Sequence, residues 1–185
     1  MINSANTPNK VLIEEWLTTS SATDSEINML AEVLHAVVHA GASVSFFTPF
    51  SIDDAKAFWI DKVLPGMQTG ARRVLVARDV ERIVGTVQLE LDMPPNQQHR
   101  AAVAKLLVHP DARRRGIARA LMIALEEIAR EEGRTLLTLD TVTASGAEFL
   151  YTSLGYVNAG VIPRYARGAL TPDLESTTIM YKELS

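Results

Sequence analysis

Three consecutive arginines followed by a glycine form the stretch of this 185-residue chain that is best suited to chemistry. These residues, 113–116, lie between an apolar stretch at 102–108 and a helical pattern that begins at Ile117. The first amide groups of a helix have no partner within the helix, and the helix dipole is positive there. The arginines add charge, while Gly116 and the small Ala118 let a ligand approach the backbone. The turn therefore predicts an anion site that a diphosphate would fit.

Hydrophobic spacing predicts the elements that flank this turn. Residues 102–108 are apolar, and Pro110 cannot continue a hydrogen-bonded ladder, so we expect a strand that ends there. Across 117–129 apolar residues recur every three or four positions, with charged residues on the opposite face. This pattern predicts an amphipathic helix, which Gly133 ends.

The rest of the chain predicts a mixed α/β fold. The expected elements are a strand at 11–19, a helix at 24–40, a helix from 51 to 64 stopped by Pro65 and Gly66, strands at 72–78, 83–91 and 135–141, a helix at 144–154, and strands at 156–161 and 177–182 separated by a long loop. The strand, helix and strand across 102–141 imply a parallel pair, and the pair at 72–91 implies antiparallel neighbours. Ligands are expected beyond the carboxyl end of the central strand.

Composition excludes several classes of protein. The net charge is −4, which does not suit nucleic acid or an anionic membrane as the main partner. The chain has no cysteine, which excludes disulfides, thiolate metal sites and a cysteine nucleophile. His35 and His39 are four residues apart on one helix face but have no convincing third ligand near them, so we predict no metal site. Residues 1–10 are polar and contain no secretory signal pattern, and no apolar run approaches the roughly 18 residues of a membrane span. We therefore expect one cytoplasmic domain over residues 1–185, with 1–10 as a frayed tail.

The spacing of the arginine turn separates it from the common nucleotide-binding signatures. It lacks the glycine, lysine and hydroxyl pattern of a P-loop and has one glycine where the dinucleotide fingerprint has three. Arg113-x-x-Gly116-x-Ala118 instead resembles the Arg/Gln-x-x-Gly-x-Gly/Ala signature of the GNAT superfamily, the acetyl-CoA-dependent N-acetyltransferases. The resemblance implies acetyl-CoA as the cosubstrate.

A second stretch carries the same resemblance. Ala147, Tyr151, Leu154, Gly155 and Tyr156 match the Ala-x-x-x-Tyr-x-x-Leu-Gly-Phe/Tyr helix of the superfamily. The resemblance implies the GNAT fold, an α/β (α+β mixed) class. That fold is a central mixed, mostly antiparallel sheet of about seven strands flanked by helices, with a V-shaped splay at the central strand.

The resemblance also implies roles for particular residues. Tyr151 would protonate the departing thiolate of CoA, and Asp140, at the end of the strand after the long helix, would take the proton of the attacking amine. An aspartate at a strand end can equally bond local backbone, and a water chain could serve as the base, so these alternatives stay open. The residues expected to bind acetyl-CoA are Leu106, Leu107, Val108, Arg113, Arg114, Arg115, Gly116, Ile117, Ala118 and Arg119.

The class of molecule that receives the acetyl group is indicated only by a closer resemblance. Residues 39–46, 100–108 and 136–141 resemble bacterial tabtoxin resistance proteins, which acetylate an amino-acid toxin, and this implies a small-molecule amine acceptor. Two departures concern Ala144, where the superfamily often has Asn, and Ala102, where the toxin-resistance proteins have a carboxylate. A protein N-terminal acetyltransferase and a non-catalytic CoA-binding regulatory module are the alternatives. The expected partners are the amine and, at most, a second copy of the chain.

Overall fold

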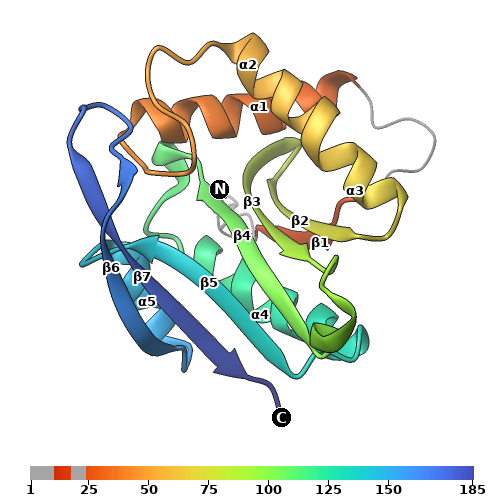
Figure 1. Ribbon diagram of the computed structural model, residues 1–185. Helices are drawn as coiled ribbons and strands as arrows, with labels where there is room; N and C mark the ends of the chain where they lie inside the picture. Colours follow the sequence, from red (N-terminus) through yellow and green to blue (C-terminus); the bar gives the residue numbers. More distant parts are fainter. Residues whose placement is uncertain (1–10, 18–23) are drawn as a thin grey trace, which may run out of the picture.

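The computed structural model describes residues 11–17 and 24–185 (Figure 1). The strands are β1 (Leu12–Glu15), β2 (Arg72–Asp79), β3 (Arg82–Glu90), β4 (Arg100–Val108), β5 (Leu136–Val142), β6 (Val157–Arg167) and β7 (Leu174–Glu183). They form one sheet in the order β1-β2-β3-β4-β5-β7-β6, in which only β4 and β5 are parallel. The expected mixed, mostly antiparallel seven-stranded sheet is confirmed. The expected tail 1–10, and residues 18–19 of the expected first strand, lie outside the described residues.

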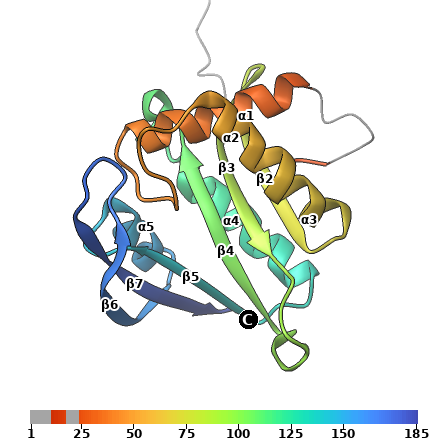
Figure 2. The same ribbon diagram turned by 45° about the horizontal axis from the view of Figure 1, so that its top comes forward.

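Helices cover both faces of the sheet (Figures 1 and 2). They are α1 (Asp24–His39), α2 (Ile52–Phe58), the π-helical turn η1 (Trp59–Val63), α3 (Leu64–Gln68), α4 (Ile117–Glu131) and α5 (Gly146–Ser153), with short 3-10 turns η2 (Pro95–Gln97) and η3 (Pro110–Ala112). The apolar stripe of α4 packs on one face of the sheet, and α1 and α2 pack on the other. No described helix combines the length and the apolar character needed to cross a membrane.

The two central strands part soon after they begin. The pairing of β4 with β5 extends only from Arg100 opposite Leu136 to Ala102 opposite Thr138. Beyond this point β4 continues beside β3, with a register shift that marks a bulge at Lys105, where φ is +51°. A bulge bends the strand and increases its twist. The splay expected at the central strand is therefore present, and it leaves one edge of β4 without a neighbouring strand.

Two expected connections are wrong. Pro65 and Gly66 do not stop the second helix, which continues as α3 to Gln68. The π turn before α3 places Pro65 in a first helical turn, where a backbone N–H is not needed. The long loop expected before 177 is instead a hairpin, because β6 reaches Arg167. Pro163 lies in a bulge of this edge strand, where it interrupts no inner ladder.

Helix α4 lies close to the sheet at Gly85, and this contact yields a stability prediction. A Cβ added there would lie 3.0 Å from the Leu107 carbonyl oxygen and 3.2 and 3.3 Å from side-chain carbons of Ile117 and Leu121. Gly85→Ala should therefore lower the free energy of unfolding by about 1–3 kcal/mol, as overpacking does. Urea denaturation measures this, with Gly146→Ala as the control, because an added Cβ meets no atom within 4 Å there. Equal stability of the two variants would contradict the close packing.

Candidate active site

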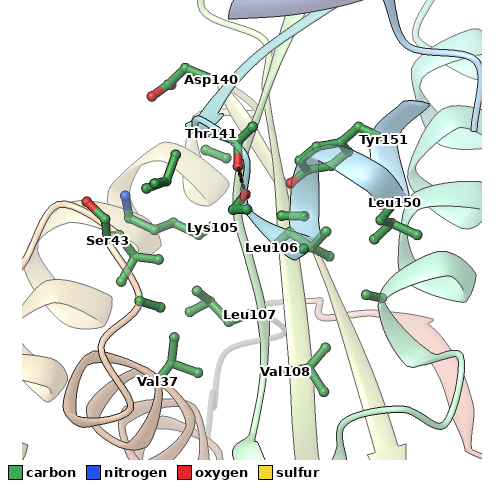
Figure 3. A pocket seen from close by; sticks show the side chains of 18 of the residues that line it. Val37, Ser43, Lys105, Leu106, Leu107, Val108, Asp140, Thr141, Leu150 and Tyr151 are labelled. Atoms are coloured by element: carbon green, nitrogen blue, oxygen red, sulfur yellow. Dashed lines mark hydrogen bonds between the residues drawn. The ribbon is translucent and has the colours of Figure 1, made fainter. Parts of the chain in front are cut away.

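A cavity of about 610 Å³ opens where β4 and β5 part (Figure 3). Its walls come from the second half of β4, the end of β5, the first turns of α4 and α5, and residues 41–45. Seven of the twelve residues predicted for the site line it: Leu106, Leu107, Val108, Arg113, Ala118, Asp140 and Tyr151. The fold therefore brings both predicted catalytic side chains and the central strand to one cavity.

The free edge of β4 presents backbone donors to this cavity. The N–H groups of a strand point alternately to its two edges. His109 donates its N–H to the Val84 carbonyl of β3 at 2.8 Å, so the N–H groups of Leu106 and Val108 point to the opposite, open edge. The same alternation directs the Leu107 N–H toward β3. Two of the three predicted amides therefore remain as preorganised donors for a carbonyl oxygen.

The arginine turn leads into α4 through a left-handed glycine. Gly116, the N-cap of α4, has φ +77°, and no side chain caps the helix. The first amides of α4 therefore keep their hydrogen-bonding capacity for a ligand. Ile117 is only 3% exposed, so its side chain belongs to the core and only its backbone can serve such a ligand. Gly116 has no atom within 4 Å of the place where a Cβ would lie.

The four arginines near this turn differ in their partners. Arg113 lines the cavity, where its Nε donates to the Val108 carbonyl at 3.4 Å. Arg114 is exposed and has φ +62°. The other two are engaged by side chains: Arg115 with the Asp79 carboxylate at 2.7 Å and Arg119 with the Ser153 hydroxyl at 2.5 Å. The turn is thus cationic, with two of its guanidinium groups held in place beside the start of α4.

Tyr151 is a buried phenol on α5. Ser145 caps this helix, accepting a hydrogen bond from the Glu148 N–H. The Tyr151 side chain is 6% exposed, packs with its ring centroid 5.7 Å from that of Tyr156, and lines the cavity (Figure 3). Burial, followed by the negative charge of Asp140, raises the pKa of the Tyr151 phenol. The group is therefore protonated near neutral pH and is suited to donate a proton.

Asp140 faces a different part of the site. Its side chain is exposed near the end of β5, with its carboxylate 3.4 Å from the Thr177 hydroxyl, which donates its proton to the Thr141 carbonyl at 2.9 Å. Figure 3 shows the carboxylate pointing away from Tyr151, toward the side where Ser43 and Lys105 lie. The Asp140 carboxylate and the Tyr151 phenol therefore face different parts of the cavity.

The two departures from the family pattern, Ala144 and Ala102, have identifiable surroundings in the structure. Ala144 has φ +59°, a conformation that Asn adopts more readily than Ala, and its N–H donates to Glu148 at 2.6 Å. Ala102 pairs across strands with Glu90, so the two side chains share one face of the sheet. Glu90 is held by the guanidinium of Arg72 at 2.8 Å. A carboxylate is thus present on the neighbouring strand, beside the position where Ala102 lacks one.

Two further features were not foreseen from the sequence. The N–H and hydroxyl of Thr48 both donate to the Ala169 carbonyl, at 2.9 and 3.2 Å, and the Arg167 guanidinium lies 4.5 Å from the Phe47 ring centroid. These contacts join the segment 41–50, of which residues 41–45 line the cavity, to the β6–β7 hairpin. A second cavity of about 470 Å³ lies beside Ser45 and is lined by four phenylalanines, Phe46, Phe47, Phe50 and Phe58.

Comparison with known proteins places the chain in a family. It belongs to the acetyltransferase (GNAT) family, whose sequence model matches residues 39–156. Human N-acetyltransferase 8 is 37% identical over 87 residues, which make up 46% of this chain and 38% of the human protein. Rat N-acetyltransferase 8B is 36% identical over a segment of the same length, which spans 39% of it. The chain thus spans less than half the length of these relatives, and the predicted GNAT resemblance is confirmed.

Solved structures share the whole fold. An N-acetyltransferase from Staphylococcus aureus Mu50 superposes with a TM-score of 0.76 at 18% identity, covering 95% of this chain and 99% of that protein. The Salmonella typhimurium protein yncA, solved with its cofactor acetyl-CoA, gives a TM-score of 0.73 at 20% identity over 95% of each chain. At such identities the likeness concerns the fold alone.

The buried tyrosines predict a pH dependence of stability. Burial raises the pKa of Tyr151 and, with Glu126, that of Tyr156, above the ordinary value of about 10. Above that pH the unfolded chain loses these protons before the folded one does, so stability should fall as pH rises, by up to about 1.4 kcal/mol per pH unit for each phenol. Urea unfolding on either side of this pH measures the slope. Tyr151→Phe should reduce it, and an unchanged slope would contradict the burial of an ionisable phenol.

Proposed function

We propose that this protein transfers an acetyl group from acetyl-CoA to a primary amine of a small molecule by direct attack in a ternary complex. The observation that carries the proposal is the single cavity that holds the free β4 amides and the Tyr151 phenol. Because the chain has no cysteine, a cysteinyl acyl-enzyme cannot form, and a one-step route is favoured. When bound, acetyl-CoA would supply the activated acetyl group.

The cofactor end of the site is suited to acetyl-CoA. The uncapped start of α4 and the cationic turn 113–115 offer donors and charge to a diphosphate. The N–H groups of Leu106 and Val108 would hold the thioester carbonyl oxygen and stabilise the negative charge that develops on it. One aligned donor of this kind is worth about 3 kcal/mol of the barrier.

The two proton transfers of the reaction are assigned to the Tyr151 phenol and the Asp140 carboxylate. The amine nitrogen forms a bond to the acetyl carbon as the carbon–sulfur bond breaks, and the amine loses one proton while the sulfur gains one. Tyr151 would donate its phenolic proton to the departing sulfur. Asp140, or a water that it orients, would accept the proton of the amine. Burial of Tyr151 supports its role because it keeps the donor protonated.

A small acceptor is favoured over a peptide because the segment that lines one wall of the cavity is tied to the β6–β7 hairpin. A protein N-terminus needs an open groove, whereas Thr48 and Ala169 join the segment 41–50 to the β6–β7 hairpin. Gly41 lies against the Leu170 side chain at the same junction, where an added Cβ would approach it to 3.2 Å. We therefore propose an amino-acid-like metabolite or toxin as the acceptor. Lack of cysteine also fits action in a reducing cytoplasm.

The proposal predicts a specific kinetic effect of Tyr151→Phe. Loss of the phenolic proton donor should lower kcat about a hundredfold or more, because general acids contribute at least this much, while acetyl-CoA affinity stays unchanged. The assay is CoA thiol release with a panel of small amino acids, toxin-like amines, polyamines and N-terminal peptides. Tyr156→Phe is the matched control, since this buried tyrosine contacts Tyr151 but does not line the cavity.

The outcomes separate the alternatives. Turnover of a small amine that is lost in Tyr151→Phe and kept in Tyr156→Phe supports the proposal. Preferred turnover of peptides would indicate an N-terminal acetyltransferase. Acetyl-CoA binding without turnover of any acceptor would favour a regulatory module, and a fully active Tyr151→Phe would remove the tyrosine from the mechanism.

A further inference from the structure

The Lys105 side chain lies on the α1 and α2 side of β4, although strand alternation predicts the α4 side. Val103 packs in the core beneath α4, and strict alternation would put residues 105 and 107 there as well. The bulge at Lys105 reverses this alternation. Leu107 consequently packs in the core beneath α1, and the Lys105 side chain reaches the segment 42–47 and α2 on the same side. The bulge thus delivers an ammonium group to the same side of the cavity as Asp140.

The surroundings of this ammonium are mostly apolar. Nζ donates to the Ser45 hydroxyl at 3.0 Å and lies 5.9 and 5.8 Å from the ring centroids of Phe46 and Phe58. Within the described residues, no carboxylate forms an ion pair with it. Lys105 is half-buried, and a partly desolvated ammonium without a paired carboxylate keeps N–H donors and its charge available for an anion.

The charges around Lys105 agree with this lack of a paired carboxylate. Burial lowers the pKa of the Lys105 ammonium, and the positive charge of Arg72 acts in the same direction. The negative charges of Glu90 and Asp140 oppose the decrease but do not cancel it. Glu90 is already paired with Arg72 at 2.8 Å, and Asp140 is exposed at the mouth of the cavity. An anion brought by a ligand would complete the set.

We propose that Lys105 binds a carboxylate of the acetyl acceptor, so that the substrate is an amino acid or a related amino acid-like compound. This inference rests on the proposed acetyl transfer and adds the group that selects the substrate. Figure 3 shows the Lys105 ammonium and the Asp140 carboxylate on the same side of the cavity, opposite Tyr151. The two charges would hold the carboxylate and the amine of one zwitterion, with the amine directed at the β4 edge. A diamine without a carboxylate would instead meet an unpaired positive charge.

The test uses the wild-type protein and does not require turnover. Lys105 is labelled with an amine-reactive acylating reagent, and its rate of modification is followed by peptide mass spectrometry. The probes are N-acetyl amino acids, which have the carboxylate of the expected products, and their primary amides, which differ only in lacking it. Carboxylates should slow labelling of Lys105 about tenfold at saturation, as expected for a charge-assisted hydrogen bond, and amides should not. Lys56, on α2 outside both cavities, reports general effects on labelling.

Two outcomes would overturn the inference: no protection by any N-acetyl amino acid, or equal protection by acids and amides.

Steady-state kinetics then separate carboxylate recognition from a role as general base. Lys105→Met should raise KM for amino acids about tenfold or more while sparing kcat, with Lys105→Arg retaining part of the affinity and Lys56→Met serving as the control. An equal loss of kcat for all amines would contradict recognition. Failure of the acetyl-transfer proposal would appear separately, as protection of Lys105 by carboxylates in a protein that never releases CoA.

Discussion

The site depends on one constraint in the sheet: β4 and β5 pair through only three residues of each strand before they part. A parallel pair that continued would use the outward N–H groups of Leu106 and Val108 in its ladder, and no donor would remain for a ligand. It would also close the space between the strands. The parting therefore creates the cavity and its backbone donors together, and α4 begins beside them because the cationic turn connects it directly to β4.

The ionisable side chains of the cavity fall into two groups at different places around it. Tyr151 is held on α5 in a buried setting that keeps it protonated. Asp140 and Lys105 lie across the cavity from it, and residues 41–45 beside them belong to a segment that Thr48 joins to the β6–β7 hairpin. In such a partly dehydrated space, charges and hydrogen bonds act more strongly than in water. Under the proposed function, the Asp140 carboxylate would activate the amine of the acceptor and the Lys105 ammonium would bind its carboxylate.

Features set by residues close in the sequence could be predicted, whereas features set by contacts between distant residues could not. The apolar stripe of α4 is a local pattern, and it correctly predicted a helix that begins at Ile117, directly after the arginine turn. Tyr151 could be proposed only through a family motif, because spacing alone cannot tell a proton-donating phenol from a packed one. Lys105 was missed because a bulge reverses strand alternation, and its position is set by register with β3. The contact of Thr48 with Ala169 joins residues 121 positions apart, which no local pattern reports.

Hydrogen exchange of backbone amides with and without acetyl-CoA would test the central claim most directly. If the parted strand and the start of α4 form the cofactor site, acetyl-CoA should slow exchange at Leu106, Val108 and the first turn of α4. Gly116→Glu should abolish this protection by placing a negative charge at the diphosphate position, whereas Gly133→Glu, with a similar φ of +69° beyond the other end of α4, should retain it. Protection elsewhere, or protection that survives Gly116→Glu, would contradict the account.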